Sequence, residues 1–318
     1  MYNPLVSIII PVYNGSNYLK ESIDSALAQT YNRIEVIVIN DGSQDDGATE
    51  MIALSYGDKI RYFYKENGGV ATALNFGIEK MKGEWFSWLS HDDLYLPNKI
   101  SSAIEIINSK KIDINNTIIS CEMELINSKG EPIFRVNRSY LGLFSGKEMF
   151  KSLCIGNNLS GCSLLIPKIA LKQVKGFNPD YKYIQDWVCW IMLSFYGYNF
   201  YLYNDKLIKS RVHPMQDTIT LAKLQPIEIN QFLNNFLYKL GSNISANKYY
   251  LRTLLFYFCT KINNKNIRYE YKATLKKYNL YNLTDEFRYY VYLLKGIFLC
   301  EIKKKYRSII NNKYRGTK

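Results

Sequence analysis

The chain has 318 residues, of which 47% are hydrophobic and 15% aromatic, and its formal net charge is +13. This composition excludes an intrinsically disordered protein and suffices for one large α/β domain with an appendage, or for two modest domains. The charge is uneven, because residues 219–318 carry 19 Lys and Arg against 5 Asp and Glu, while residues 1–218 are close to neutral. We therefore predict one domain over residues 1–218 and a separate basic region over residues 219–318.

Two hydrophobic periods alternate in the N-terminal half. Short apolar, β-rich runs predict buried strands, and the segments between them repeat apolar residues at i, i+3/i+4 and i+7, which predicts helices. The predicted strands are 6–12, 35–40, 60–64 and 85–89, and the predicted helices are 19–27, 70–81 and 100–107. This succession is typical of an α/β fold with a mostly parallel sheet, in which ligands bind at the carboxyl ends of the strands.

Carboxylates follow two of the predicted strands. Asp41 follows the second strand, and Asp92 and Asp93 follow the fourth. Asp41 with Gly42 also fits an ordinary turn, and the two adjacent aspartates also fit the cap of a helix that begins near Pro97. Adjacent carboxylates repel each other, however, and a hard divalent cation is a common reason to keep them together.

Several longer strings carry a resemblance to a known family. The strings VSIIIPVYNGSNYLKESIDSALAQTY, IEVIVINDGSQD, NGGVATALNFGI and GEWFSWLSHDDLYLPNKI occur in this order, followed by NLSGCSLLIPK, KGFNPDYKYIQDWVCWIML and RVHPMQDT. This ordered set, from about residue 5 to about residue 218, resembles glycosyltransferase family 2. The resemblance implies the GT-A fold, with a nucleotide-sugar half over residues 1–116 and an acceptor half over residues 117–218. We expect the basic region after it to be helical.

The resemblance implies a nucleotide-diphosphate sugar as the donor, with a UDP-sugar favoured. In similar enzymes the end of the first strand lines the base pocket, and the aspartate after the second strand accepts a hydrogen bond from a uracil-type ring. The helix after the third strand begins beside the nucleotide, where its free N–H groups favour anionic oxygen. The matching positions, together with an aspartate near the ribose, are Pro11, Tyr13, Asp41, Asn67, Gly69, Asn75 and Asp92.

The same resemblance implies a divalent metal, Mg²⁺ or Mn²⁺, held against the donor diphosphate. Asp93 is the predicted ligand, with Asp92 and His213 as further candidates, and His213 equally fits a loop histidine held by backbone contacts. The family often has an aspartate where Ser90 stands, so the strict D-x-D spacing is absent. One or two carboxylates nevertheless suffice for Mg²⁺, which keeps phosphate oxygens and water as its other ligands.

Asp186 is the predicted catalytic base of an inverting single displacement, because an acceptor hydroxyl needs a positioned carboxylate to take its proton. It matches the aspartate of the family's ED-type element, with Gln185 in place of the preceding acid. Trp187 and Trp190 are candidates for a face that binds the acceptor sugar, and they equally fit a helix core. Because Gln185 and Ser90 depart from the family pattern, the alternative function is a nucleotide-sugar-binding or regulatory protein without turnover.

The basic region over residues 219–318 has two interpretations. Its 13 tyrosines and its positive charge favour a peripheral position at the anionic inner face of the cell membrane, near a lipid-linked acceptor glycan. A plain helical bundle accounts for the same residues equally well.

The remaining expectations concern the place of the protein in the cell. No apolar segment reaches the roughly twenty residues that span a bilayer, and none resembles a secretion signal, so we expect a cytoplasmic protein and not a processive polysaccharide synthase. We find no nucleic-acid-binding motif and expect no nucleic-acid partner. The family-level expectation is assembly of a capsule, lipopolysaccharide or glycoprotein glycan.

Overall fold

The computed structural model describes residues 2–134, 140–156 and 159–241, together with residues 247, 249, 250, 252–254, 273 and 276. All four predicted N-terminal strands are confirmed, as β1 (Val6–Val12), β2 (Ile34–Asp41), β3 (Arg61–Lys65) and β4 (Trp85–Trp88). The predicted helices are confirmed as α1 (Leu19–Leu27), α3 (Val70–Lys80) and α4 (Lys99–Ser109). A further helix, α2 (Ala48–Leu54), was not predicted. The helices predicted in the basic region lie mostly outside the described residues.

The four N-terminal strands pair in parallel, in the order β3, β2, β1 and β4. The sheet continues through β9 (Leu164–Pro167), which is antiparallel to both of its neighbours, β4 and β6 (Thr117–Ile126). Strand β10 (Asn199–Arg211) runs parallel to β6, and the short strands β5 (Leu94–Tyr95), β7 (Pro132–Phe134) and β8 (Gly142–Phe144) add antiparallel pairs. The predicted α/β class with a largely parallel N-terminal sheet is confirmed.

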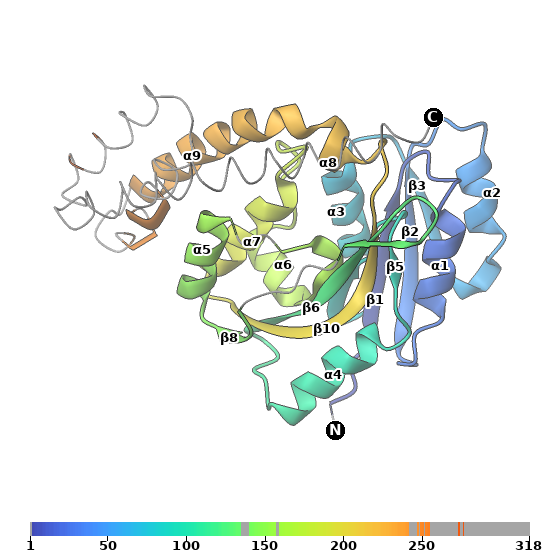
Figure 1. Cartoon of the computed structure of the whole chain (residues 1–318), viewed down its shortest axis with the longest axis horizontal. Helices are drawn as coiled ribbons and strands as arrows, with labels where there is room; N and C mark the ends of the chain where they lie inside the picture. The colour runs from blue at the N-terminus through green and yellow to red at the C-terminus, as the bar shows by residue number, and fades with distance from the viewer. Residues whose placement is uncertain are drawn as a thin grey trace. The chain divides into compact units, whose positions relative to one another are not determined.

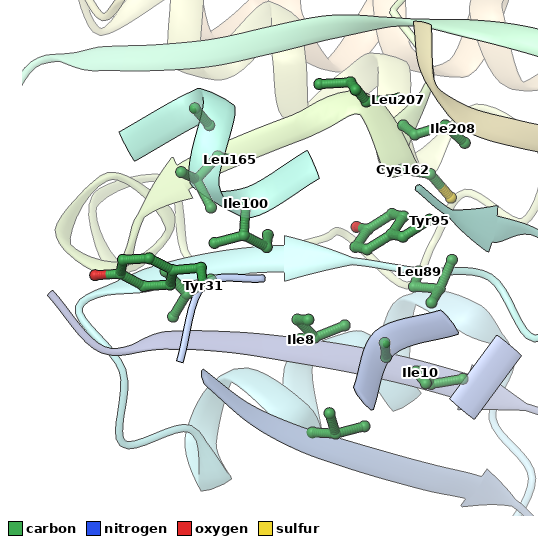
Figure 2. Packing of buried hydrophobic residues seen from close by; sticks show 14 of the residues in the cluster. Ile8, Ile10, Tyr31, Leu89, Tyr95, Ile100, Cys162, Leu165, Leu207 and Ile208 are labelled. Carbon is green, nitrogen blue, oxygen red and sulfur yellow. The ribbon is translucent and has the colours of Figure 1, made fainter. Parts of the chain in front are cut away.

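One face of the sheet packs against α1, α2 and α4 (Figure 1). Alternate residues of β1, such as Ile8 and Ile10, point to this face and contact apolar residues of the three helices, Ile100 among them, in one buried cluster. Figure 2 shows this cluster together with Leu89 and Cys162, which lie next to the loop after β4. Because strand side chains alternate between faces, the positions between them serve the other layer.

The other face packs against α3, α6 (Lys168–Val174) and α7 (Gln185–Phe195). Ile9 of β1 lies so close to α3 that a Cβ at Gly77 would stand 2.5 Å from its side chain. Phe177, in the α6–α7 connection, is fully buried and packs edge-on against Trp88 and Trp190. This aromatic cluster fixes α7, and with it Asp186, against the sheet.

Two compact units divide the chain by internal contacts. The first comprises Met1–Leu153 and Asn157–Asn234, and the second comprises Cys154–Gly156 and Asn235–Lys318. The first unit therefore contains α5 (Gly146–Ile155) up to Leu153, α8 (Asp217–Thr220) and the beginning of α9 (Gln225–Gly241). The division into residues 1–218 and 219–318 stays a prediction. Among the described residues, no helix combines the length and apolarity that crossing a membrane requires.

Candidate active site

Loops that follow β1, β2 and β4 lie at one edge of the sheet, because these strands are parallel. Hydrogen bonds join the first two loops: the amide of Asn14 donates to Ser43 Oγ at 2.9 Å, and the amide of Gln44 donates to Asn14 Oδ1 at 2.7 Å. The loop after β4 is tied to α1, whose Ser22 Oγ donates to the carbonyl oxygen of Ser90. The predicted crevice thus has a fixed frame.

Asp41 gathers the predicted nucleotide-binding residues of the second and third loops. Its carboxylate accepts hydrogen bonds from Lys65 Nζ at 2.5 Å, from the amide of Gly68 at 3.1 Å and from the amide of Gly69 at 2.7 Å. Asn67 Nδ2 donates to the carbonyl oxygen of Asp41 at 2.9 Å. Asp41 is 3% exposed, and its carboxylate lies beside the ammonium group of Lys65 and the backbone N–H groups of Gly68 and Gly69. The structure thus brings Asp41, Asn67 and Gly69 together, as expected from the sequence.

Pro11 and Tyr13 stand at the end of β1 in different surroundings. Pro11 is buried and pairs with Ile39 of β2, whereas Tyr13 is 43% exposed. The aromatic ring of Tyr13 is therefore the accessible one of the two, and Pro11 supports the strand beneath it.

Asn75 makes contacts that its predicted role did not anticipate. Its Nδ2 donates to the carbonyl oxygen of Phe177 at 2.7 Å, and its Oδ1 accepts from the amide of Phe177 at 2.8 Å. The side chain also abuts Gly176, where an added Cβ would lie 2.3 Å from Oδ1 and φ is +71°. Asn75 therefore holds the backbone of the α6–α7 connection, and its place beside the nucleotide stays a prediction.

Asp92 and His213 meet although 121 residues separate them. Asp92 Oδ2 lies 2.9 Å from His213 Nε2, and the His213 ring centroid lies 5.3 Å from that of Tyr18. His213 follows β10, so the loop after β4 and the end of β10 face each other. Of the two roles considered for His213, a side chain directed at the predicted metal site fits this position.

Asp93 faces inward. Its Oδ1 accepts a hydrogen bond from the amide of Arg211 at 2.8 Å, and its Oδ2 accepts one from Cys162 Sγ at 3.3 Å. Burial, together with the neighbouring charge of Asp92, raises the pKa of Asp93 above its usual range. Each of its oxygens thus already accepts one hydrogen bond from the protein, and its predicted role as a metal ligand stays a prediction.

Arg211 is a site residue to which the sequence analysis gave no role. It is 1% exposed, its Nε donates to the carbonyl oxygen of Asp92 at 2.9 Å, and its Nη2 donates to Glu21 Oε2 at 2.7 Å. Its guanidinium also lies 4.3 Å from the centroid of the Tyr18 ring. Arg211 therefore fixes the backbone of the loop that presents Asp92. The feature of the sequence that could have indicated this role is its position two residues before His213 in the RVHP string.

Asp186 lies in the first turn of α7. Its Oδ1 accepts the amide of Trp187 at 2.6 Å, which anchors one oxygen to the helix backbone. Burial raises the pKa of Asp186 to about 6. The carboxylate is thus ionised at neutral pH, yet more basic than an ordinary aspartate, as a general base requires.

One short segment connects Asp92 with the turn before Asp186. After His213, Asp217 lies near enough to Asp92 and His91 for their charges to act on its carboxyl group, whose pKa burial raises. The next residue, Thr218, accepts a hydrogen bond at its carbonyl oxygen from the Tyr183 hydroxyl at 3.4 Å. Residues 213–218 therefore run from the proposed diphosphate end of the site to the α7 end.

The two tryptophans predicted for acceptor binding differ. Trp190 is 1% exposed and packs edge-on against Phe177, so the prediction that it presents a face to a sugar is wrong and its alternative, helix core, is confirmed. Trp187 is partly exposed, donates from Nε1 to the carbonyl oxygen of Leu153 at 3.3 Å and packs edge-on against Phe232. Its role toward an acceptor stays a prediction.

Of the three predicted metal ligands, Asp92 and His213 have side chains in direct contact with each other. Among the residues that the structure describes, no three His, Cys, Asp or Glu side chains form a metal-binding group. The two ligand atoms of Asp92 and His213 lie 2.9 Å apart, and neighbouring ligands in an octahedron about 2.1 Å from Mg²⁺ lie about 3 Å apart. The pair therefore fits Mg²⁺ or Mn²⁺ that takes its other ligands from diphosphate and water.

Comparison with known proteins decides the family. The model of Glycosyl transferase family 2 matches residues 7–164. An uncharacterized glycosyltransferase of Rickettsia typhi is 51% identical over 241 residues, which cover 75% of this chain and 73% of the relative. The chain belongs to glycosyltransferase family 2. The family assignment made from the sequence strings is thereby confirmed, and the protein is a glycosyltransferase.

Two solved structures show the fold of this glycosyltransferase. S. aureus TarS 1-349 in complex with UDP-GlcNAc aligns with a TM-score of 0.59 at 15% identity, covering 86% of this chain and 80% of TarS. The mannosyltransferase PcManGT from Pyrobaculum calidifontis, in complex with GDP-Man and Mn²⁺, aligns with a TM-score of 0.54 at 18% identity, covering 94% of this chain and 86% of PcManGT. The glycosyltransferase has the predicted GT-A fold.

Proposed function

We propose that this glycosyltransferase transfers a sugar from a UDP-sugar to a hydroxyl of an acceptor glycan, with inversion at the anomeric carbon. The observation that carries the proposal is the segment 213–218, which bonds Asp92 through His213 and contacts Tyr183, three residues before Asp186. A diphosphate-binding end and a carboxylate base at opposite ends of one short segment suit a displacement that needs both groups in fixed positions.

The surroundings of Asp41 support a uracil-type base. A uracil ring presents one N–H between two carbonyl oxygens, so it can donate to the Asp41 carboxylate and accept from Lys65, which lies 2.5 Å from that carboxylate. Cytosine presents an acceptor nitrogen at the same position and would face the carboxylate unfavourably. The UDP-GlcNAc complex of TarS agrees with this choice of nucleotide.

Asp92 and His213 would hold Mg²⁺ or Mn²⁺ in this proposal. When bound, the cation supplies positive charge that stabilises the departing diphosphate. The Mn²⁺ in the PcManGT complex supports such a cofactor. Arg211 keeps the Asp92 backbone in place through its Nε hydrogen bond, and Asp93 closes the loop from inside.

Asp186 acts on the acceptor. While Oδ1 stays bonded to the amide of Trp187, the other carboxylate oxygen takes the proton of the acceptor hydroxyl. The hydroxyl oxygen forms its bond to the anomeric carbon as the bond from that carbon to the diphosphate oxygen breaks, and the bonding electrons leave with the nucleotide. A single displacement of this kind inverts the configuration at the anomeric carbon.

Measurement of nucleotide release tests the proposal. The wild-type chain, incubated with a panel of UDP- and GDP-sugars and with Mn²⁺ or Mg²⁺, is expected to release UDP by transfer or slow hydrolysis. Asp92→Asn and Asp186→Asn are expected to lose most of that release, and Asp186→Asn is expected to keep the thermal stabilisation that UDP produces. Stabilisation by UDP without turnover of any donor would instead favour the alternative, a nucleotide-sugar-binding protein.

We also propose that the acceptor belongs to a bacterial surface polysaccharide or glycoprotein glycan and that residues 219–318 rest on the inner face of the membrane. The excess positive charge of this region is the supporting observation. Flotation of the full chain with anionic and with neutral lipid vesicles tests it. Equal recovery with both vesicles would exclude electrostatic membrane binding.

A further inference from the structure

Glu228 holds the turn that leads into α7. It lies in the first turn of α9 and is 5% exposed. Its Oε1 accepts the amide of Lys182 at 2.8 Å, and its Oε2 accepts the amides of Tyr183 at 2.9 Å and Ile184 at 3.0 Å. One buried carboxylate thus satisfies three consecutive backbone N–H groups that are 44 to 46 residues away in the sequence.

These contacts explain why a charged group is tolerated in this buried place. Hydrogen bonds from N–H groups to a carboxylate are about twice as strong as those between neutral groups. Glu228 also lies at the N-terminal end of α9 and next to the N-terminal end of α7, and the partial positive charge of a helix N-terminus stabilises a carboxylate. Removal of the carboxylate would leave three buried or partly buried N–H groups without their partner.

A second residue of α9 holds the same segment from the other side of the turn. Phe232 lies four residues after Glu228, on the same face of the helix. Its ring centroid is 6.1 Å from that of Tyr181 and 5.3 Å from that of Trp187. Residues on both sides of Asp186 are therefore fixed to α9, by a carboxylate before it and by an aromatic ring after it.

We infer that Glu228 is a positioning residue for catalysis: it fixes the backbone of residues 182–184 and thereby aims the carboxylate of Asp186 at the acceptor hydroxyl. The inference rests on the proposed role of Asp186 as the base. It also assigns the start of α9, beyond the predicted boundary at residue 218, to the catalytic machinery. A displacement of the base by about 1 Å is enough to reduce a rate by about 100-fold, so the effect of losing this clamp is measurable.

The test uses the full chain with Glu228→Gln, which keeps the size of the side chain but loses the charge and one acceptor oxygen. With the UDP-sugar that gives the fastest UDP release, kcat is expected to fall about 10- to 100-fold. The KM for the donor is expected to stay within about twofold, because the hydrogen bonds of Glu228 go to residues 182–184 and not to the residues proposed to hold the donor. Hydrogen exchange at the amides of residues 182–184 is expected to accelerate. Glu228→Asp, which keeps the charge on a shorter side chain, is expected to recover part of kcat.

A double mutant separates positioning from general loss of structure. If Glu228 acts through Asp186, adding Glu228→Gln to Asp186→Asn reduces the residual rate no further. Glu105→Gln on α4, which changes an exposed glutamate, is the matched control and is expected to behave as wild type.

The outcomes distinguish this inference from the proposed function. If Asp186→Asn is inactive but Glu228→Gln keeps the wild-type kcat, the positioning role is refuted and the proposed base stands. Losses that multiply in the double mutant also refute it, because they mean that Glu228 acts independently of Asp186. If Asp186→Asn keeps full activity, or no donor is turned over by the wild type, both the proposed function and the positioning role fall.

Discussion

The pKa of Asp186 links catalysis to stability and gives the sharpest prediction. Burial raises this pKa from 3.8 to about 6. A base with this pKa is ionised at pH 8, half ionised near pH 6 and about one-tenth ionised at pH 5, so kcat is expected to fall about tenfold for each further unit of acidification. Asp186→Asn is expected to lower kcat by a factor of about 100 to 10,000 and to abolish this dependence on Asp186.

The same shift has a consequence for folding. The pKa of Asp186 is higher in the folded state than in the unfolded chain, so the folded protein binds more protons between pH 4 and pH 6. The stability that protonation of Asp186 contributes is therefore lost as the pH rises through this window. Two pKa units correspond to at most about 3 kcal/mol. Asp186→Asn removes this partly buried charge and is expected to be more stable than wild type at pH 8, with little difference at pH 4.

Two assays check this reasoning. Steady-state UDP release between pH 5 and 8.5 gives the acid limb of kcat, and urea unfolding at pH 4 and pH 8 gives the free energy of unfolding of each variant. The comparison of wild type with Asp186→Asn removes the contribution of other titrating groups. An Asp186→Asn protein that keeps the wild-type kcat, or that is less stable than wild type at pH 8, would refute the assignment of this carboxylate as a buried base.

Three further predictions concern the polar side chains of Asp92, Asn75 and Lys99. Asp92→Asn is expected to raise the Mn²⁺ concentration at which UDP release is half-maximal and to lower kcat/KM by at least about tenfold. Titration of UDP release with Mn²⁺ measures this, and an unchanged titration curve would remove Asp92 as a ligand. Asn75→Ala leaves the N–H and C=O of Phe177 unpaired and is expected to lower the free energy of unfolding by about 1–3 kcal/mol, whereas the exposed Glu79→Ala on the same helix is the neutral control. Burial lowers the pKa of Lys99 to about 8. As the pH rises from 8 to 10, the free energy of unfolding of the wild type is therefore expected to increase by up to about 3 kcal/mol relative to that of Lys99→Met. Parallel curves of the free energy of unfolding against pH for the two proteins would contradict this.

The hydrophobic periodicity predicted the N-terminal strands and helices well, because it depends only on residues that are close together in the sequence. The strands are apolar on both faces because helices cover both sides of the sheet, and such runs are recognisable without any partner. The antiparallel insertion of β9 between β4 and β6 has no comparable signal. Its pairing depends on segments about 80 and 45 residues away, as the positions of these strands show.

The site residues illustrate a second limit. Asp92 and Asp93 are neighbours with the same side chain, and the sequence placed the metal on Asp93. Both lie in the turn after β4, where the amide of Asp93 donates to the carbonyl oxygen of Ser90. Only the folded chain shows that Asp93 turns inward to Arg211 and Cys162 while Asp92 contacts His213. Composition and spacing hold no information about that direction.

By itself, the sequence determined the fold, the family and the residues from which a donor site can be built, because hydrophobic period and ordered motifs are properties of short stretches of chain. Only the tertiary structure decided that Asp92 contacts His213, that Asn75 bonds the backbone of Phe177, and that Glu228 bonds the turn before Asp186. Each of these contacts joins segments 44 to 121 residues apart. Their hydrogen bonds depend on how layers of the fold come together, and no local pattern records that.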